Sequence, residues 1–450
     1  MSPRPRTQVE LLRTLDETFL RTRVEFETMW PTATLVIDSA PFRDAAGVLD
    51  RDRVAAALLV VAERFTETRL RLVDAPLGVT APLWVPAGPL DRDYHLGWFP
   101  HVPGAGEEAA LFCGAAHAPR RRDRPLWRYT VIERADGDLA VVGSVQHALG
   151  DALFALRFVD ALMQGDVGDA GDAGRAGPAG DAASLGPAPS SRLAGLLIVW
   201  GRWLRARSGP GDAWHEYWRK PFRKRLTRWG GRLLRPLRDR AIERRGLRAV
   251  LAPPMSAAYW CTPLAPVAEL ARRLGGSVND LVAALALRAA LRGEGNAGEA
   301  SLALPVSRRR REGAGVRNSI VMLRVTVPAD AGLAAAVAAV HGQVTGFARS
   351  GEGDLRGAES GGYASYLPYR RERAALGGAE VRRVLMWPVP APGARFGLLA
   401  SSYGGELSFT ARAAPGLSAE DLLAAVRAEL AAEGVAAAGP AAPVEQVVVS

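Results

Sequence analysis

The sequence predicts a mixed α/β (α+β) protein of two sandwich lobes, joined by a flexible linker and a basic helical segment. Three observations support this fold class. The chain has 450 residues, more than one ordinary domain needs. Both halves mix short strand-like segments with helical patterns, and a Gly-rich stretch separates them. The expected divisions are an N-terminal lobe at 1–164, the linker at 165–190, the basic segment at 191–250 and a C-terminal lobe at 251–450.

The clearest elements of the N-terminal lobe are two strands joined by a turn at Asp136-Gly137, a pair typical of hairpins. The helix that follows them is apolar on nearly every side, which indicates burial between layers. In chain order the expected elements are a strand at 32–38, helices at 52–65 and 107–112, strands at 127–133 and 139–145, and a helix at 152–163.

A histidine lies where the second hairpin strand ends. By strand alternation His147 shares a face with Val141 and Val145, so its ring is expected at the edge of packed structure. The chain turns at Gly150, and Asp151 stands at the head of the next helix. A neutral imidazole can take a proton from an alcohol, and the carboxylate can fix the loop. Because this spacing alone more often marks a structural histidine, the catalytic interpretation depends on the rest of the sequence.

The linker is defined by glycine, which recurs at every third position from 165 to 180. Six such triplets with one proline are too few for a collagen helix, so the stretch is interpreted as flexible.

The positive charge of the protein is concentrated after the linker. Residues 201–250 hold 16 Lys and Arg against four acidic residues, a net of +12, whereas the whole chain carries +10. Leucines and tryptophans at helical spacing from 193 to 204 predict an amphipathic helix at the start of the basic segment. A solvated helix that bridges the lobes, a lipid-surface helix and a nucleic-acid site are the three interpretations. The mixture of Trp and Arg favours the lipid headgroup region, and we find no nucleic-acid-binding motif. The residues expected to contact lipid are Trp200, Arg202, Trp203 and Arg205.

The C-terminal lobe is expected to start near Met255. Two helices begin with the pattern of a serine followed three residues later by an aspartate, Ser277/Asp280 and Ser418/Asp421, which is typical of helix N-termini. The stretch through the 350s and 360s is Gly-rich and is interpreted as loop. The expected elements are helices at 281–291, 333–347 and 418–432, strands at 301–305 and 320–327, and a hairpin of 397–402 with 406–411.

Several classes of protein find no support in the sequence. Cys113 and Cys261 can form no disulfide framework, and neither has the spacing of a metal site. No nucleotide-binding or serine-esterase motif is present, and the histidines lack metal-ligand spacing, so we expect neither cofactor nor metal. We see no signal peptide, and prolines interrupt the longest uncharged stretch, 249–267. The sequence therefore predicts a soluble or peripheral protein of the reducing cytoplasm.

Several short motifs, taken together and in order, resemble one family. The histidine lies in a Gln-His-x-x-Gly-Asp-Ala context, where the family has His-His-x-x-x-Asp-Gly. The chain resembles the bacterial wax ester synthase/acyl-CoA:diacylglycerol acyltransferase family, within the superfamily of chloramphenicol acetyltransferase and condensation domains. The matching positions are Gln146-His147-Ala148-Leu149-Gly150-Asp151-Ala152, Pro125-Leu126-Trp127, Asn279-Asp280, Asp93-Tyr94-His95, Asn318 and Ser402-Tyr403-x-Gly405.

This resemblance implies two chloramphenicol-acetyltransferase-like lobes that meet at a solvent channel. His147 would be the general base that takes the proton from a fatty alcohol or diacylglycerol as its oxygen attacks an acyl-CoA thioester, without covalent intermediate or metal. Asp151 would orient the motif loop. Asn279 would help to shape the site, although a purely structural place in the first turn of its helix is the alternative.

Two departures from the family pattern bear on activity. Gln146 replaces the first histidine, so a hydrogen-bonding side chain remains but a second titrating group is lost. Ala152 replaces glycine, which matters only if that residue needs a positive φ. The alternatives are therefore a condensation-type acyltransferase for a specialised metabolite or glycolipid, and a catalytically silent lipid binder. For the leading function we expect a cytoplasmic enzyme that is peripherally associated with the inner membrane face or with lipid droplets.

Overall fold

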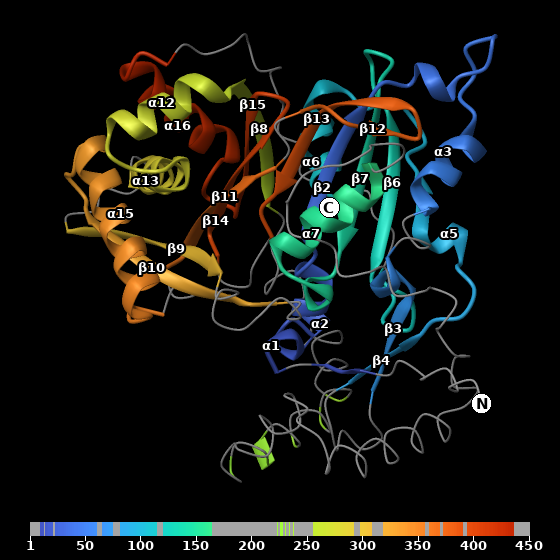
Figure 1. Ribbon diagram of the computed structural model, residues 1–450, viewed down its shortest axis with the longest axis horizontal. Helices are drawn as coiled ribbons and strands as arrows, with labels where there is room; N and C mark the ends of the chain where they lie inside the picture. Colours follow the sequence, from blue (N-terminus) through green and yellow to red (C-terminus); the bar gives the residue numbers. More distant parts are fainter. Residues whose placement is uncertain are drawn as a thin grey trace, which may run out of the picture.

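Two lobes stand side by side in the computed structural model, each built on a six-stranded sheet (Figure 1). Figure 1 shows the blue-to-green lobe formed by the first part of the chain beside the yellow-to-red lobe formed by the last part. The structure describes residues 10–12, 14–20, 23–60, 65–74, 82–114, 120–163, 223, 226–227, 230, 234, 237, 255–291, 298–307, 318–355, 360–369, 372–389 and 394–435.

The sheet of the N-terminal lobe runs in the order β12-β13-β2-β7-β6-β5. Its pairs are antiparallel except β5 with β6. The predicted hairpin is confirmed residue for residue, because β6 and β7 occupy 127–133 and 139–145. The bounds are β2 Thr32–Ile37, β5 Leu96–Trp98, β6 Trp127–Glu133, β7 Leu139–Val145, β12 Ala375–Leu376 and β13 Ala379–Trp387.

Two helices cover the two faces of this sheet. The strands alternate, so that Leu35, Tyr129 and Val141 pack toward α7 (Ala152–Met163) in the main core. Their neighbours, among them Val142, pack on the other face with α6 (Ala105–Phe112). The helix predicted as buried between layers is therefore α7, and it lies directly after the motif histidine.

Smaller elements close the end of this lobe. The first part of the helix predicted at 52–65 is confirmed as α3 (Arg51–Leu59), which Asp50 caps, whereas residues 61–64 lie outside the described residues. A three-stranded sheet has the order β1-β4-β3. The remaining elements are β1 Glu10–Leu11, α1 Thr14–Thr18, α2 Arg23–Thr28, β3 Leu70–Val73, β4 Leu83–Pro86 and α5 Arg92–His95.

The C-terminal lobe has the strand order β10-β9-β11-β14-β15-β8, and its helices among the described residues, α12, α13, α15 and α16, pack on one face. In Figure 1 these helices lie on the side of the sheet away from the N-terminal lobe. The bounds are β8 Ser256–Pro263, α12 Leu264–Arg273, α13 Val278–Leu291, β9 Glu299–Ser307, β10 Ile320–Pro328, α15 Leu333–Ser350, β11 Gly362–Pro368, β14 Phe396–Tyr403, β15 Glu406–Ala413 and α16 Ala419–Ala432.

The interpretation of the 360s as loop is wrong, because β11 is a central strand there and pairs in parallel with β14 and β9. The glycine that suggested a loop has a packing reason instead. A Cβ at Gly362 would lie 2.1 Å from the ring of Phe396 on β14. The strand therefore requires glycine at its first position so that the two strands can approach.

The two lobes are not two contiguous stretches of chain. Strands β12 and β13 belong to the predicted C-terminal lobe at 251–450, yet they extend the sheet of the N-terminal lobe. Figure 1 shows β13 in orange among the blue and green strands. This corrects a simple division at residue 250. The physical reason is that β2 would otherwise be an edge strand, and β13 pairs with it along its length.

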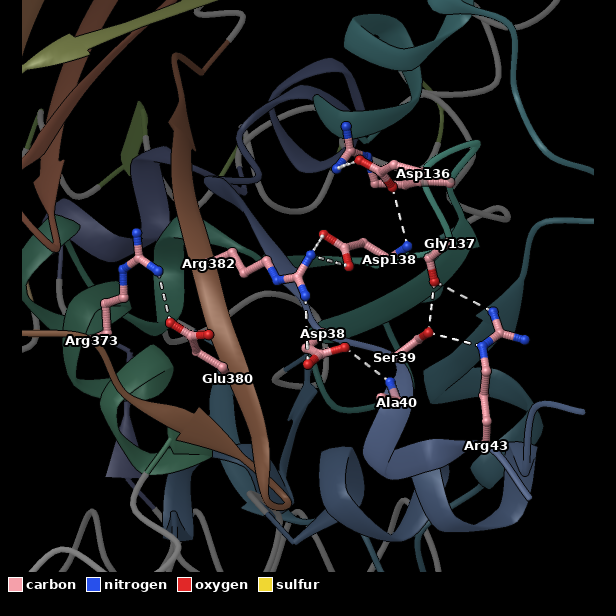
Figure 2. A network of polar contacts seen from close by, with 11 residues as sticks. Asp38, Ser39, Ala40, Arg43, Asp136, Gly137, Asp138, Arg373, Glu380 and Arg382 are labelled. Carbon is pink, nitrogen blue, oxygen red and sulfur yellow. Dashed lines mark hydrogen bonds and ion pairs between the residues drawn. The ribbon is translucent and has the colours of Figure 1, made fainter. Parts of the chain in front are cut away.

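Ion pairs fix β13 where it joins the N-terminal lobe (Figure 2). The guanidinium of Arg382 lies 2.8 Å from Asp138 and 3.5 Å from Asp38. The hydroxyl of Ser39 donates to the carbonyl oxygen of Gly137, at the hairpin turn, over 2.6 Å. The turn predicted at 136–137 is thereby linked both to the end of β2 and to β13.

Among the described residues no single helix is long and apolar enough to cross a membrane. Within the same residues, α12 and α13 are together long and apolar enough to span a membrane, but the two helices are bent by 88° relative to each other. The predicted linker at 165–190 lies outside the described residues, as does nearly all of the basic segment at 191–250.

Candidate active site

Backbone hydrogen bonds fix His147 at the end of β7. Its amide donates to the carbonyl oxygen of Met29 over 2.9 Å, and the preceding strand continues toward it from Val145. The preceding residue, Gln146, is fully buried, and its Nε2 donates to the carbonyl oxygen of Phe19 over 2.9 Å. Its Oε1 accepts from the amide of Ala148 over 2.5 Å. The residue in place of the family's first histidine is therefore a hydrogen-bonding support, as the alternation predicted.

The imidazole of His147 contacts an asparagine from the other lobe. Asn318 Oδ1 lies 3.2 Å from His147 Nδ1. Asn318 Nδ2 donates to Asp16 Oδ1 over 2.7 Å and to the carbonyl oxygen of His147 over 2.8 Å. Because both of those partners are acceptors, the amide must present its oxygen to the ring. Nδ1 therefore carries the proton, and Nε2 holds the free lone pair.

The surroundings of the ring keep it neutral. Phe19 stacks on His147 with ring centroids 4.2 Å apart and planes 18° apart. Burial lowers the pKa of His147 below its ordinary value, while Asp151 and the bond to Asn318 act in the opposite direction. A neutral ring with a free Nε2 is the form that a general base requires.

Asp151 connects the motif loop to both lobes. Its side chain is buried, with Oδ1 accepting from the amide of Phe154 over 3.3 Å at the start of α7. Its Oδ2 accepts from the amide of Ser319 over 3.2 Å, next to the asparagine that holds the histidine. The carboxylate thus caps a helix and positions the Asn318 segment.

The other two motif positions are explained by packing. Gly150 has extended backbone, with φ 169°, so no positive φ in the left-handed region is required there. A Cβ on Gly150 would instead lie 2.2 Å from side-chain carbons of Phe154. Ala152 is the first residue of α7 and lines the cavity described next, so alanine in place of glycine is compatible with this backbone.

A cavity of about 610 Å³ extends from His147 between the lobes and into the N-terminal lobe. Its lining is mainly apolar. Leu15 and Leu355, which are exposed, show where it opens to the surface. From the N-terminal lobe the lining includes Phe19, Leu35, Tyr129, Val141, Gly143, Val145, His147, Phe158 and Leu162; from the C-terminal part it includes Pro305, Ile320, Tyr363, Trp387 and Leu399.

The Pro125-Leu126-Trp127 motif supports the loop without lining the cavity. The carbonyl oxygen of Leu126 accepts from the amide of Gln146 over 2.9 Å. Trp127 is fully buried and stacks on His95 at 4.0 Å between ring centroids. Burial lowers the pKa of His95 to about 4, so this second motif histidine stays neutral and structural.

Asn279 and Asp280 are not beside His147, and neither lines the cavity. Asn279 Oδ1 accepts from the amide of Tyr366 over 3.2 Å, which fixes α13 to β11. Asp280 Oδ2 accepts from the amide and hydroxyl of Ser277, each over 2.8 Å. Of the two interpretations left open for Asn279, these contacts favour the structural one. The lipid-contacting set Trp200, Arg202, Trp203 and Arg205 lies outside the described residues.

Sequence reasoning missed two residues of the site, Asp16 and Phe19. Both lie before the strand at 32–38, which is the first element expected from the sequence. Neither residue belongs to a recognisable sequence motif. Their roles arise because α1 and the loop after it pack against the turn at the end of β7. An acidic residue that is 3 % exposed is a signal of function only once burial is known.

The fold and the site together define a two-lobed domain with a histidine on the wall of a cavity that both lobes line. The model of the wax ester synthase/diacylglycerol acyltransferase catalytic domain matches residues 12–282. The chain therefore belongs to this family, and the resemblance in the motifs is confirmed.

Curated relatives and solved structures agree with this membership. Two proteins of Mycobacterium tuberculosis (strain ATCC 25618 / H37Rv), provisionally named diacylglycerol O-acyltransferases, are similar to parts of the chain. One is 36% identical over 96 residues and the other 31% identical over 159 residues. The matched segments cover 21% and 34% of this chain, and only 20% and 31% of those relatives.

Two solved structures share this fold over nearly the whole length of the chain. The wax ester synthase/diacylglycerol acyltransferase from Marinobacter aquaeolei VT8 has a TM-score of 0.56 at 16% identity, covering 94% of this chain and 98% of that one. The first condensation domain of the CDA synthetase has a TM-score of 0.58 at 18% identity, covering 98% and 100%. The predicted two-lobed fold class is thereby confirmed.

Proposed function

We propose that the protein is an acyl-CoA-dependent O-acyltransferase that transfers a fatty acyl group to a fatty alcohol or to diacylglycerol. One observation carries the proposal. The free Nε2 of His147 belongs to a residue on the wall of a long, mainly apolar cavity that both lobes line. Such a cavity suits aliphatic chains, and a neutral imidazole is suited to remove a proton from a hydroxyl near pH 7.

In the proposed reaction Nε2 takes the proton of the alcohol while its oxygen attacks the thioester carbonyl carbon. The new C–O bond forms, and the C–S bond breaks when the tetrahedral intermediate collapses. The imidazolium then returns the proton from Nε2 to the departing CoA thiolate, so protons balance over the cycle. Throughout, the Nδ1 proton stays on the hydrogen bond to Asn318, which keeps the ring in one orientation.

The partner of Nδ1 is a neutral amide rather than a carboxylate, and this suits the chemistry. A carboxylate would stabilise the imidazolium and raise the pKa of His147, whereas burial lowers it here. A thiolate is a good leaving group, so the acid step needs little help, and a ring that gives up its proton readily is adequate.

The test is thiol release from palmitoyl-CoA by the purified protein, with hexadecanol or dipalmitoylglycerol added separately. His147→Ala is compared with His101→Ala, a matched loss of an imidazole that is half-exposed and does not line the cavity. Acceptor-dependent release should fall about 10²- to 10⁴-fold in the first variant and stay unchanged in the second.

The same assay separates the competing functions. Release that persists in His147→Ala would show that another group is the base. Folded protein that releases no thiol with either acceptor, but does so with a hydroxylated specialised metabolite or glycolipid, would identify the condensation-type alternative. Lipid binding without any release would identify a catalytically silent relative.

We also propose that the basic segment docks the enzyme on a lipid surface, at the inner membrane face or on lipid droplets. The supporting observation is the net charge of +12 over 201–250, interleaved with tryptophan. Co-sedimentation with vesicles of anionic lipid should weaken when Trp200, Arg202, Trp203 and Arg205 are replaced by Ala. Equal binding of the variant and the parent would refute this docking.

A further inference from the structure

One arm of the cavity follows strand β7 away from His147. Val145, Gly143 and Val141 all line the cavity, at alternate positions on the face of the strand toward α7. Phe158 and Leu162 of α7 line it from the other side. With a rise of about 3.4 Å per extended residue, Gly143 lies at most roughly 14 Å along the chain from His147. An aliphatic chain whose reacting end is at His147 would pass this point part of the way along its length.

A tyrosine ring forms the wall at this point. Tyr129 of β6 pairs directly with Gly143 in the sheet. A Cβ at Gly143 would lie only 2.9 Å from Cε1 of Tyr129, so the ring lies over the glycine and depends on its missing side chain. The ring also stacks on Phe158, with centroids 6.1 Å apart. The tyrosine ring thus lies between the sheet and α7.

The hydroxyl of this tyrosine has no hydrogen-bond partner in the part of the chain that the structure describes. The residue is 1% exposed. Several other buried polar atoms there also lack a partner, but none of those residues lines the cavity. Burial raises the pKa of Tyr129 well above its ordinary value, so the group is a neutral O–H donor. An unpaired buried donor lowers stability and requires an explanation, such as a ligand that completes it.

We propose that the Tyr129 hydroxyl is a specificity-determining donor that binds an oxygen atom carried part of the way along a long aliphatic chain. The substrate class is then an oxygenated chain, bearing a hydroxyl, oxo or ether group, rather than a plain saturated one. This inference rests on the proposed acyltransferase function and deepens it. The oxygen can belong to the acyl donor or to the alcohol acceptor, since either chain could enter the arm beside β7.

The experiment measures kcat/KM for matched substrates in the parent enzyme and in Tyr129→Phe. In the donor arm, palmitoyl-CoA is compared with hydroxypalmitoyl-CoA isomers substituted at successive mid-chain carbons, with hexadecanol as acceptor. In the acceptor arm, hexadecanol is compared with mid-chain hexadecanediols, with palmitoyl-CoA as donor. The arm that shows the preference identifies the source of the oxygen.

The parent enzyme should prefer one mid-chain isomer over the plain chain, and Tyr129→Phe should reduce that preference about 3- to 10-fold, the contribution of one neutral hydrogen bond. An unchanged preference in both arms would overturn the proposal. Palmitoyl-CoA with hexadecanol tests the acyltransferase function without any mid-chain oxygen. Failure of the proposed function is therefore distinguishable from failure of this inference.

Thermal unfolding supplies a second readout that does not depend on activity. Tyr129→Phe removes an unpaired buried hydroxyl, so Tm should stay equal or rise. Tyr94→Phe is the matched control, because its buried hydroxyl accepts from the amide of Arg121 over 3.0 Å, and its Tm should fall. A fall in Tm for Tyr129→Phe would show that an ordered water already satisfies the hydroxyl, and would overturn the proposal.

Discussion

The side-chain oxygen of Asn318 lies 3.2 Å from Nδ1 of His147, although 171 positions separate the two residues in the sequence. The asparagine precedes β10 of the C-terminal lobe, and the histidine follows β7 of the N-terminal lobe. The proton on the imidazole is therefore placed by a residue of the opposite lobe. The tautomer of the proposed base is therefore fixed only when the two lobes meet at this point.

Replacing this asparagine should impair the base without removing it. Asn318→Ala leaves Nδ1–H without its acceptor, so the ring can turn and can take the other tautomer. We expect kcat to fall about 10- to 100-fold with KM little changed, a smaller loss than removal of the histidine itself causes. Steady-state kinetics with palmitoyl-CoA and hexadecanol checks this. A selective rise in KM would instead place the asparagine in substrate binding.

Asp16 should act through Asn318. Its carboxylate accepts from Asn318 Nδ2 over 2.7 Å and is 3 % exposed. Asp16→Ala removes this acceptor, so the amide can rotate and offer Nδ2 to the imidazole. We expect a loss in kcat of about 3- to 10-fold, the contribution of one hydrogen bond. In the double variant with Asn318→Ala the two losses should not add, whereas additive losses would show that the aspartate acts by another route.

The acid limb of the pH profile should reflect the lowered pKa of His147. The base must be neutral, and burial holds its pKa below the ordinary value of about 6.5. Activity should therefore persist below pH 6.5 and be lost as pH falls through the pKa of the folded protein. Asn318→Asp places a carboxylate at Nδ1, which raises that pKa, so the limb should move to higher pH. Measuring kcat/KM from about pH 5 to about pH 8 in both proteins checks the direction.

Gly150 should not tolerate a side chain. A Cβ there would lie 2.2 Å from carbons of Phe154, so Gly150→Ala should lower the free energy of unfolding by about 1–3 kcal/mol. Gly342, inside α15, provides the control, because a Cβ at that position would meet no heavy atom within 4 Å. Gly342→Ala should raise stability by about 0.5–1 kcal/mol through helix propensity. Urea denaturation measures both, and equal changes would contradict the packing argument.

Features that depend on local sequence were predictable. The hairpin of β6 and β7, the position of His147 at its end and the helix after it follow from alternation, an Asp-Gly turn and apolar periodicity. The same holds for the helix N-terminus at Ser418, whose side chain accepts from the amide of Asp421. In each of these the determining contacts lie within a few residues of one another.

Features that depend on long-range packing were not predictable. Asn318 was identified through the motif resemblance, but its bond to His147 requires two lobes to meet. Asp16 and Phe19 join the same site from a third segment. Strand β11 was mistaken for loop because Gly362, which reads as a turn residue, is required by the ring of Phe396 on the neighbouring strand. The pairing of β13 with β2 could not be predicted from the local sequence of either strand.

The position of β13 also determines when the protein can complete its fold during synthesis. Trp387 donates from Nε1 to the hydroxyl of Thr34, a residue made 353 positions earlier. At about 5–20 residues per second, β2 leaves the ribosome roughly 20–70 s before its partner strand exists. Throughout that interval one edge of β2 has no partner and is open to pairing with other chains. The sheet of the first lobe is therefore complete only after most of the second lobe has been translated.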